Sequence, residues 1–178
     1  MNIWKGPENS WNASLCGNEV VFGKGSIGTH NFDTGITKDW TFPGANTYQG
    51  GFGLPNVFLR AILTNPDGSS RLEWVNTLTG DMTFIQNLPP CSSFKAGPGL
   101  HWAAICQSDL WLDGNIIAQI HGRPIALSLT TENKSALAVA CASSIIPNRI
   151  AFRVYLDGIF YHEYQSKNYP DTVEDFEF

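Results

Sequence analysis

One group of glycines in the sequence has the spacing of a phosphate-binding turn. Gly23-Lys-Gly25-Ser-Ile-Gly28 fits the pattern G-x-G-x-x-G and follows the apolar run Val20-Val-Phe22. In a dinucleotide site this pattern must open a helix whose N-terminus holds the pyrophosphate. The residues from Thr29 to Gly35 begin no helical pattern. We therefore interpret the glycines as a flexible turn and expect no nucleotide cofactor.

Residues that could act as nucleophiles, bases or metal ligands are scattered. The sequence contains no Gly-x-Ser-x-Gly elbow, which a hydrolase of that class needs to present its serine. Its four histidines lack metal-ligand spacing and are interpreted as hydrogen-bonded structural residues: His30, His101, His121 and His162. We expect no cofactor and no metal site.

A pair of carboxylates offers the one route to catalysis that we weigh. A glycoside hydrolase needs two carboxyl groups roughly 5 to 10 Å apart across a cleft. Asp109 and Asp113 flank the short run Leu110-Trp-Leu112 and could approach one another. Because a turn aspartate also explains Asp113, we expect a non-catalytic protein and keep a glycoside hydrolase as the alternative.

Aromatic residues gather in a glycine-rich segment between Gly35 and Leu54. Aromatic rings can stack on the apolar face of a sugar while amides bond its hydroxyl groups. The favoured alternative is that these rings pack under the loops or against another subunit. The candidate ligand-binding or subunit-contact residues are Trp40, Asn46, Tyr48, Gln49 and Phe52, together with Trp4 and Trp11 near the N-terminus.

Hairpin turns dominate the rest of the chain. Asp67-Gly68, Asp113-Gly114 and Asp157-Gly158 each lie between β-prone runs, and Asp-Gly readily adopts the positive φ angles of a tight hairpin. We expect three hairpins, pairing 57–64 with 70–76, 110–112 with 115–120, and 150–156 with 159–165. Leu-Asp-Gly occurs at both Leu112 and Leu156, which we interpret as two similar turns and not as a repeat.

These signals predict an all-β fold, a two-sheet antiparallel β-sandwich of the jelly-roll kind. Residues 1–178 form a single domain, with a loop-rich arm and first strands at 1–55, regular hairpins at 56–168 and an acidic tail at 169–178. The segment from 35 to 54 reads as long ordered loops, because it shows little alternation. The run from Asn133 to Ala142 suits a strand or a short helix, and we favour the strand.

Composition narrows the possible partners. Charged residues make up 15% of the chain and apolar residues 43%, with a net charge of −5. About 25% charged residues is usual for a soluble domain. No run of Lys or Arg exists, so nucleic acid is not an expected partner. No apolar run reaches the ~20 residues of a membrane-spanning helix, and we expect no membrane insertion.

The N-terminal residues lack the pattern of a signal peptide. We therefore expect a soluble protein that is made in the cytoplasm and could end in a virion. Disulfide frameworks accompany secretion, so the four cysteines are expected to be buried free thiols: Cys16, Cys91, Cys106 and Cys141.

Two classes of function fit this description. The first is a structural or assembly protein that forms a homo-oligomer and contacts other particle proteins, such as a decoration, tail or fibre component of a virus or phage. The second is a carbohydrate-binding β-sandwich, a lectin or receptor-binding module with glycans as partners. The runs 100–117 and 152–159 resemble the strand-turn-strand of concanavalin-like sandwiches over a small part of the chain.

Overall fold

The structure is a computed structural model that describes residues 13–63, 68–121, 124–130, 136–142 and 150–165. These residues form antiparallel β-strands and one short 3-10 turn at Pro98–Leu100, with no α-helix among them. The expected all-β class is confirmed.

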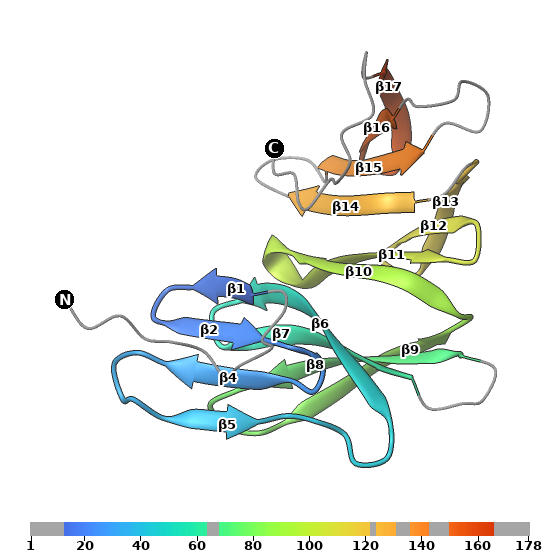
Figure 1. Ribbon diagram of the computed structural model, residues 1–178. Coiled ribbons are helices and arrows are strands. Elements are labelled where there is room, and N and C mark those ends of the chain that lie inside the picture. Colours follow the sequence, from blue (N-terminus) through green and yellow to red (C-terminus); the bar gives the residue numbers. More distant parts are fainter. Residues whose placement is uncertain (1–12, 64–67, 122–123, 131–135, 143–149, 166–178) are drawn as a thin grey trace.

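The strands are arranged in four antiparallel sheets, which we number I to IV (Figure 1). Sheet I has the order β1 (Ala13–Cys16), β2 (Glu19–Phe22), β4 (Gly28–Asn31) and β5 (Thr37–Asp39). Sheet II has the order β3 (Lys24–Gly25), β6 (Asn46–Leu54), β7 (Val57–Leu63), β8 (Ser70–Asn76) and β9 (Met82–Leu88). Sheet III has the order β10 (Cys91–Gly97), β11 (His101–Cys106), β12 (Asp109–Leu112) and β13 (Asn115–Gln119). Sheet IV has the order β14 (Pro124–Thr130), β15 (Ala136–Ala142), β16 (Ile150–Leu156) and β17 (Ile159–Gln165).

Strand order follows chain order almost throughout. Sheets III and IV are four-stranded meanders, and sheet II is a meander to which the short β3 is added. A jelly roll instead connects strands that alternate between two sheets. Among the described strands, apart from the two-residue β3, the chain completes one sheet before it begins the next, so four sheets occur where two were expected. The turn residues predicted each hairpin, but they carry no information on how successive meanders stack.

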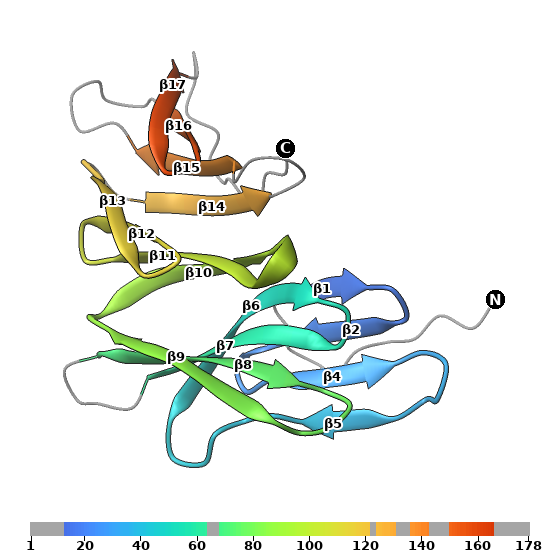
Figure 2. The same cartoon turned by 180° about the vertical axis from the view of Figure 1, so that it is seen from behind.

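The sheets form a stack, as both views of the ribbon show (Figures 1 and 2), and apolar side chains join them. Between sheets I and II, Val21 packs with Phe58 and Val75. Between sheets II and III, the core contains Leu59, Ala61, Leu72, Trp74, Leu88, Trp102, Ala104 and Cys106. Between sheets III and IV, it contains Ala103, Ile105, Leu110, Leu112, Ile120, Leu127, Leu129, Val139 and Tyr155.

The central strands of the two middle sheets are therefore buried on both faces. In β11, Trp102 and Ala104 face sheet II, while Ala103 and Ile105 face sheet IV. Because successive strand residues point to opposite faces, such a strand is apolar at successive positions. This explains why the run at 102–106 and, apart from Arg60, the run at 57–62 show no alternation in the sequence.

The three expected hairpins are present. β7 pairs with β8, β12 with β13, and β16 with β17. Both central residues of the second and third turns have positive φ, with Asp113 at 48°, Gly114 at 88°, Asp157 at 50° and Gly158 at 78°, as tight hairpin turns require. Asp67 lies outside the described residues.

The predicted long loops between Gly35 and Leu54 are wrong for most of that segment. Residues 37–39 form β5, and residues 46–54 form the nine-residue strand β6. Extra residues at Gly50 and Gly53 shift the register of β6 against β7. Such bulges break the period-two pattern, which is why the strand was not recognised. Residues 136–142 form β15, which confirms the favoured strand.

Bulges recur at equivalent places in sheets II, III and IV. The last strand of each sheet carries one extra residue relative to its neighbour: Ile85 in β9, Ile117 in β13 and Tyr161 in β17. The turns at Leu112 and Leu156 both join the third strand of a sheet to its fourth. The similar turns therefore mark corresponding positions of a repeated meander, although the sequences around them do not match.

Replacing Leu72 by alanine should strongly destabilise the protein, because Leu72 is fully buried between sheets II and III. We expect the free energy of unfolding to fall by about 2–5 kcal/mol. Leu78→Ala is the matched control, since Leu78 is 67% exposed and should change it by less than about 0.5 kcal/mol. Urea unfolding of both variants measures the difference. Equal effects would contradict the two-sided burial of sheet II.

Candidate functional site

Trp40, the first residue of the candidate aromatic set, lies in the core between sheets I and II. It is 7% exposed, and its Nε1 donates a hydrogen bond to Oγ1 of Thr29 over 2.8 Å. Its carbonyl oxygen accepts a 2.7 Å hydrogen bond from Nη1 of Arg60. Its ring meets Phe58 edge to face at 6.1 Å. Trp40 therefore joins two sheets, and its ring is covered by protein.

The other four candidates lie on β6 but point in different directions. Tyr48 packs against the core between sheets II and III, whereas Phe52 packs against the core between sheets I and II. Asn46 is exposed at the start of the strand, and the partly buried Gln49 stands opposite Arg60 in β7. The structure does not gather these residues at one surface. Trp4 and Trp11 lie outside the described residues.

A buried charge network lies close to Trp40 and was not anticipated from the sequence. Arg60 and Glu73 are direct cross-strand partners in β7 and β8, and their side chains are 2% and 6% exposed. Nη2 of Arg60 lies 2.6 Å from Oε2 of Glu73, and Nε of the exposed Arg71 lies 2.7 Å from Oε1. The sequence signal for this network is one charged residue in each of two apolar strands that pair with each other. Both carboxylate oxygens are engaged, so Glu73 neutralises Arg60.

A second polar group fixes sheet I to the turn that follows β8. Oγ1 of Thr77 donates to the buried Glu19 over 2.7 Å, and Nζ of Lys38 donates to the carbonyl oxygen of Thr77 over 2.5 Å. Nearby, Asp39 accepts a hydrogen bond from the backbone of Thr41 at 2.9 Å. Hydrogen bonds from the side chain and backbone of Thr41 lower the pKa of Asp39 below its usual value. These contacts hold sheet I in place.

Asp113, one of the two carboxylates weighed for catalysis, is part of a turn. Its Oδ1 accepts a 2.8 Å hydrogen bond from the backbone nitrogen of Trp102. Its Oδ2 lies 2.6 Å from Nδ1 of His101, and both side chains are partly exposed. With both oxygens engaged by β11, Asp113 stabilises the β12–β13 hairpin against its neighbouring strand. The positive φ of Asp113 fits this structural role.

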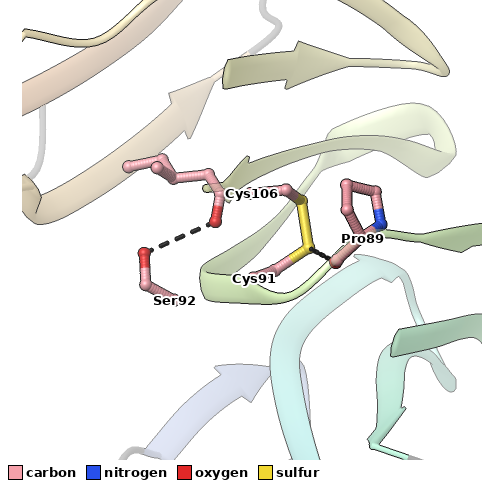
Figure 3. Close-up of a disulfide and its surroundings, with 5 residues drawn as sticks. Pro89, Cys91, Ser92 and Cys106 are labelled. Carbon is pink, nitrogen blue, oxygen red and sulfur yellow. Dashed lines mark hydrogen bonds between the residues drawn. A yellow bond between two sulfur atoms is a disulfide. The ribbon is translucent and has the colours of Figure 1, made fainter. Parts of the chain in front are cut away.

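Cys91 and Cys106 form a disulfide (Figure 3). The expectation of free thiols is wrong for this pair, although Cys16 is free and partly buried. Cys91 and Cys106 stand directly opposite one another in β10 and β11, where facing side chains come within bonding reach. The expectation of free thiols rested on the absence of a secretion signal, which carries no information on the register of β10 and β11. The side chain of Cys141 lies outside the described part of the structure.

Exposed apolar side chains, in contrast, concentrate on the last strands of sheets II, III and IV. Among the described strands, β9, β13 and β17 each stand at the end of a sheet. None of the three contains Lys, Arg or Pro, which natural sheets often place in their edge strands. Their exposed large apolar residues are Met82, Phe84, Ile116, Ile159, Phe160, Tyr161 and Tyr164.

Other kinds of site were sought in the same residues. Within the described ranges, His, Cys, Asp and Glu form no group of three that could hold a metal ion. Nor does this part of the chain contain a helix with the length and apolarity needed to cross a membrane. Comparisons of the sequence with protein-family models and with curated proteins found no match. The exposed edge strands are thus the surface feature from which function is argued.

Removing Glu73 should unfold the protein more readily than removing an exposed carboxylate. Glu73→Ala leaves Arg60 buried and uncompensated, so we expect a loss of about 3–5 kcal/mol in the free energy of unfolding. Glu163→Ala is the matched control, because Glu163 makes a 2.8 Å ion pair with Arg153 in a partly exposed position and should cost about 0–1 kcal/mol. Chemical denaturation distinguishes the two. A similar loss in both variants would refute the network's structural role.

Reducing the disulfide should also lower stability. Cys91 and Cys106 are 15 residues apart in sequence, and closing a loop of that size contributes about 3 kcal/mol in the chain-entropy model. Cys91→Ala should abolish the linked peptide in a non-reducing digest and lower the melting temperature. The control is Cys16→Ala, which leaves the disulfide intact. A wild-type digest without a Cys91–Cys106 peptide would disprove the pairing.

Proposed function

We propose that this protein is a non-catalytic structural subunit that assembles as a homo-oligomer. The observation that carries the proposal is the set of three described edge strands, β9, β13 and β17, that contain no Lys, Arg or Pro and expose large apolar side chains. A strand with a free edge offers backbone hydrogen bonds to another chain, and monomeric proteins usually block it with charge or proline. A self-associating subunit has a use for such edges.

The composition and the stack support the same function. Charged residues are 15% of the chain, which leaves less charge on the surface than most monomers carry. Three apolar cores hold the four sheets together. The resulting subunit is rigid enough to support neighbouring subunits in an assembly. We include in this proposal a role as a decoration, tail or fibre component of a virus or phage particle.

Carbohydrate binding is the less favoured function. A sugar site requires exposed rings beside polar groups that converge on one place. Trp40 is buried, and Tyr48 and Phe52 contact different cores. The assembly function needs only the exposed edges that the described strands already have.

Self-association should appear as a rise in molar mass with concentration. Sedimentation equilibrium or light scattering from about 1 to 100 µM should give masses that are multiples of the 19.6 kDa chain. A glycan array run on the same sample serves as the comparison and should show no binding. A strict monomer with no affinity for other particle proteins, or a clear glycan ligand, would overturn the proposal.

A further inference from the structure

Three exposed apolar residues occupy the same position in three successive sheets. Phe84, Ile116 and Phe160 each stand directly before the bulged residue of their strand. They are 50%, 53% and 55% exposed. Bulges are conserved features that re-aim side chains at sheet edges. Because an exposed apolar residue precedes the bulge in all three strands, these residues form a regular surface and are not three unrelated exposed side chains.

The direction of these side chains follows from their cross-strand partners. Phe84 is paired with Glu73, Ile116 with Trp111 and Phe160 with Tyr155, and residues opposite one another share a face of the sheet. Glu73 lies on the face towards sheet I, beside Arg60. Trp111 packs in the core towards sheet II, and Tyr155 in the core towards sheet III. Each exposed residue thus points towards the preceding sheet and remains half exposed.

The three strands are neighbours along one side of the stack. A Cβ atom added to Gly114, in the turn before β13, would lie 3.1 Å from Oε1 of Gln86 in β9. A Cβ added to Gly158, in the turn before β17, would lie 3.2 Å from Cγ2 of Ile117 in β13. Each turn therefore rests against the bulged region of the preceding last strand. Together β9, β13 and β17 form one surface, which we call the edge row.

We propose that the edge row binds a second copy of this chain. The inference deepens the proposed function, because it names the surface through which the subunit would assemble. Strand edges supply backbone hydrogen bonds to the second copy, and the exposed side chains supply apolar contact. A second copy carries the same stepped surface, so one contact can be used twice around a two-fold axis.

The exposed apolar area suits a weak, concentration-dependent dimer. Four large apolar side chains on the faces that point to the preceding sheets are at least half exposed: Met82, Phe84, Ile116 and Phe160. A fully buried side chain of this size removes roughly 150–250 Å² from water, so each half-exposed one offers about 100 Å². The four offer about 400 Å² per copy, or about 800 Å² for the pair, which is the size of a weak interface.

Charge favours a second copy over other partners. The edge strands contain no Lys or Arg, and the exposed Arg71 of β8, which lies 5.0 Å from the ring centroid of Phe84, is paired with Glu73. Contact with nucleic acid or anionic lipid would require unpaired basic groups. The acidic residue of β17, Glu163, is held by Arg153 of β16 at 2.8 Å. The hydrogen bond from Arg153 lowers the pKa of Glu163 below its usual value. Two copies can therefore approach without placing unpaired like charges opposite one another.

Lysine substitutions in the edge row test the proposal. Ile116→Lys and Phe160→Lys place a charge at positions that are 53% and 55% exposed, where lysine is compatible with an edge strand. Each should raise the dissociation constant of the dimer at least tenfold, as measured by sedimentation over a range of concentrations. Leu78→Lys is the matched control, because Leu78 is 67% exposed and lies in the turn before β9. It should leave the constant unchanged.

The outcomes separate this inference from the proposed function. Circular dichroism and melting curves first establish that each variant is folded, and Phe160→Lys serves if Ile116→Lys is not. A wild-type monomer at every concentration overturns both proposals. A wild-type oligomer that both lysine variants leave intact overturns the edge row alone. Weakening by Leu78→Lys to the same extent also overturns it, because the effect would then come from added charge anywhere on the surface.

Discussion

Burial of the central strands of sheets II and III on both faces is the constraint on which the rest of the structure depends. Such a strand must place an apolar side chain on each side, because other sheets cover both of its faces. The buried residues Leu59, Ala61 and Trp102 satisfy this requirement towards one core, and Phe58 and Ile105 towards the others. Where a charge enters such a strand it needs a partner. Arg60 has Glu73 directly opposite and the carbonyl oxygen of Trp40 above it.

Stacking of meanders also determines where the surface is left open. A meander has two edges, and the next sheet covers faces, not edges. In sheets II, III and IV the last strand carries a bulge and remains exposed. In contrast, β10, the first strand of sheet III, is largely half-buried. The Cys91–Cys106 disulfide also joins β10 to β11. The two sides of the stack therefore differ in chemistry. Because the meander is repeated from sheet to sheet, the last strands of the sheets form a row of edges. A contact that is weak at one sheet becomes strong when it is made at several sheets at once.

Local features of this fold were predictable from the sequence, and its long-range features were not. Asp113-Gly114 and Asp157-Gly158 specify their turns because few residue pairs tolerate two successive positive φ angles. The strand at 136–142 was favoured correctly over a helix. Nothing local, however, distinguishes a strand between two layers from one in a simple sandwich, since both are rich in apolar residues. The pairing of Cys91 with Cys106 depends on the register of β10 and β11, which is fixed by packing. The repeated meander is not evident in the sequence, because only the turns at Leu112 and Leu156 have residues in common.

The candidate aromatic site shows that the same combination of residue types, glycine and aromatic residues, can occur for two different physical reasons. Glycines beside aromatic residues suggest an open loop with rings available to a ligand, yet in β6 they allow close packing. A Cβ atom on Gly50 would lie 2.7 Å from Cδ2 of Leu59, and one on Gly53 would lie 2.9 Å from the ring of Trp74. The absence of a side chain lets a bulged strand pass over a large neighbour, so glycine here accompanies burial. In the segment from 35 to 54 the ring of Phe42 is exposed, but exposed rings are more numerous at Phe160, Tyr161 and Tyr164, in a strand whose sequence gives no sign of this exposure. Exposure in this molecule is a property of position in the stack, and residue type alone does not reveal it.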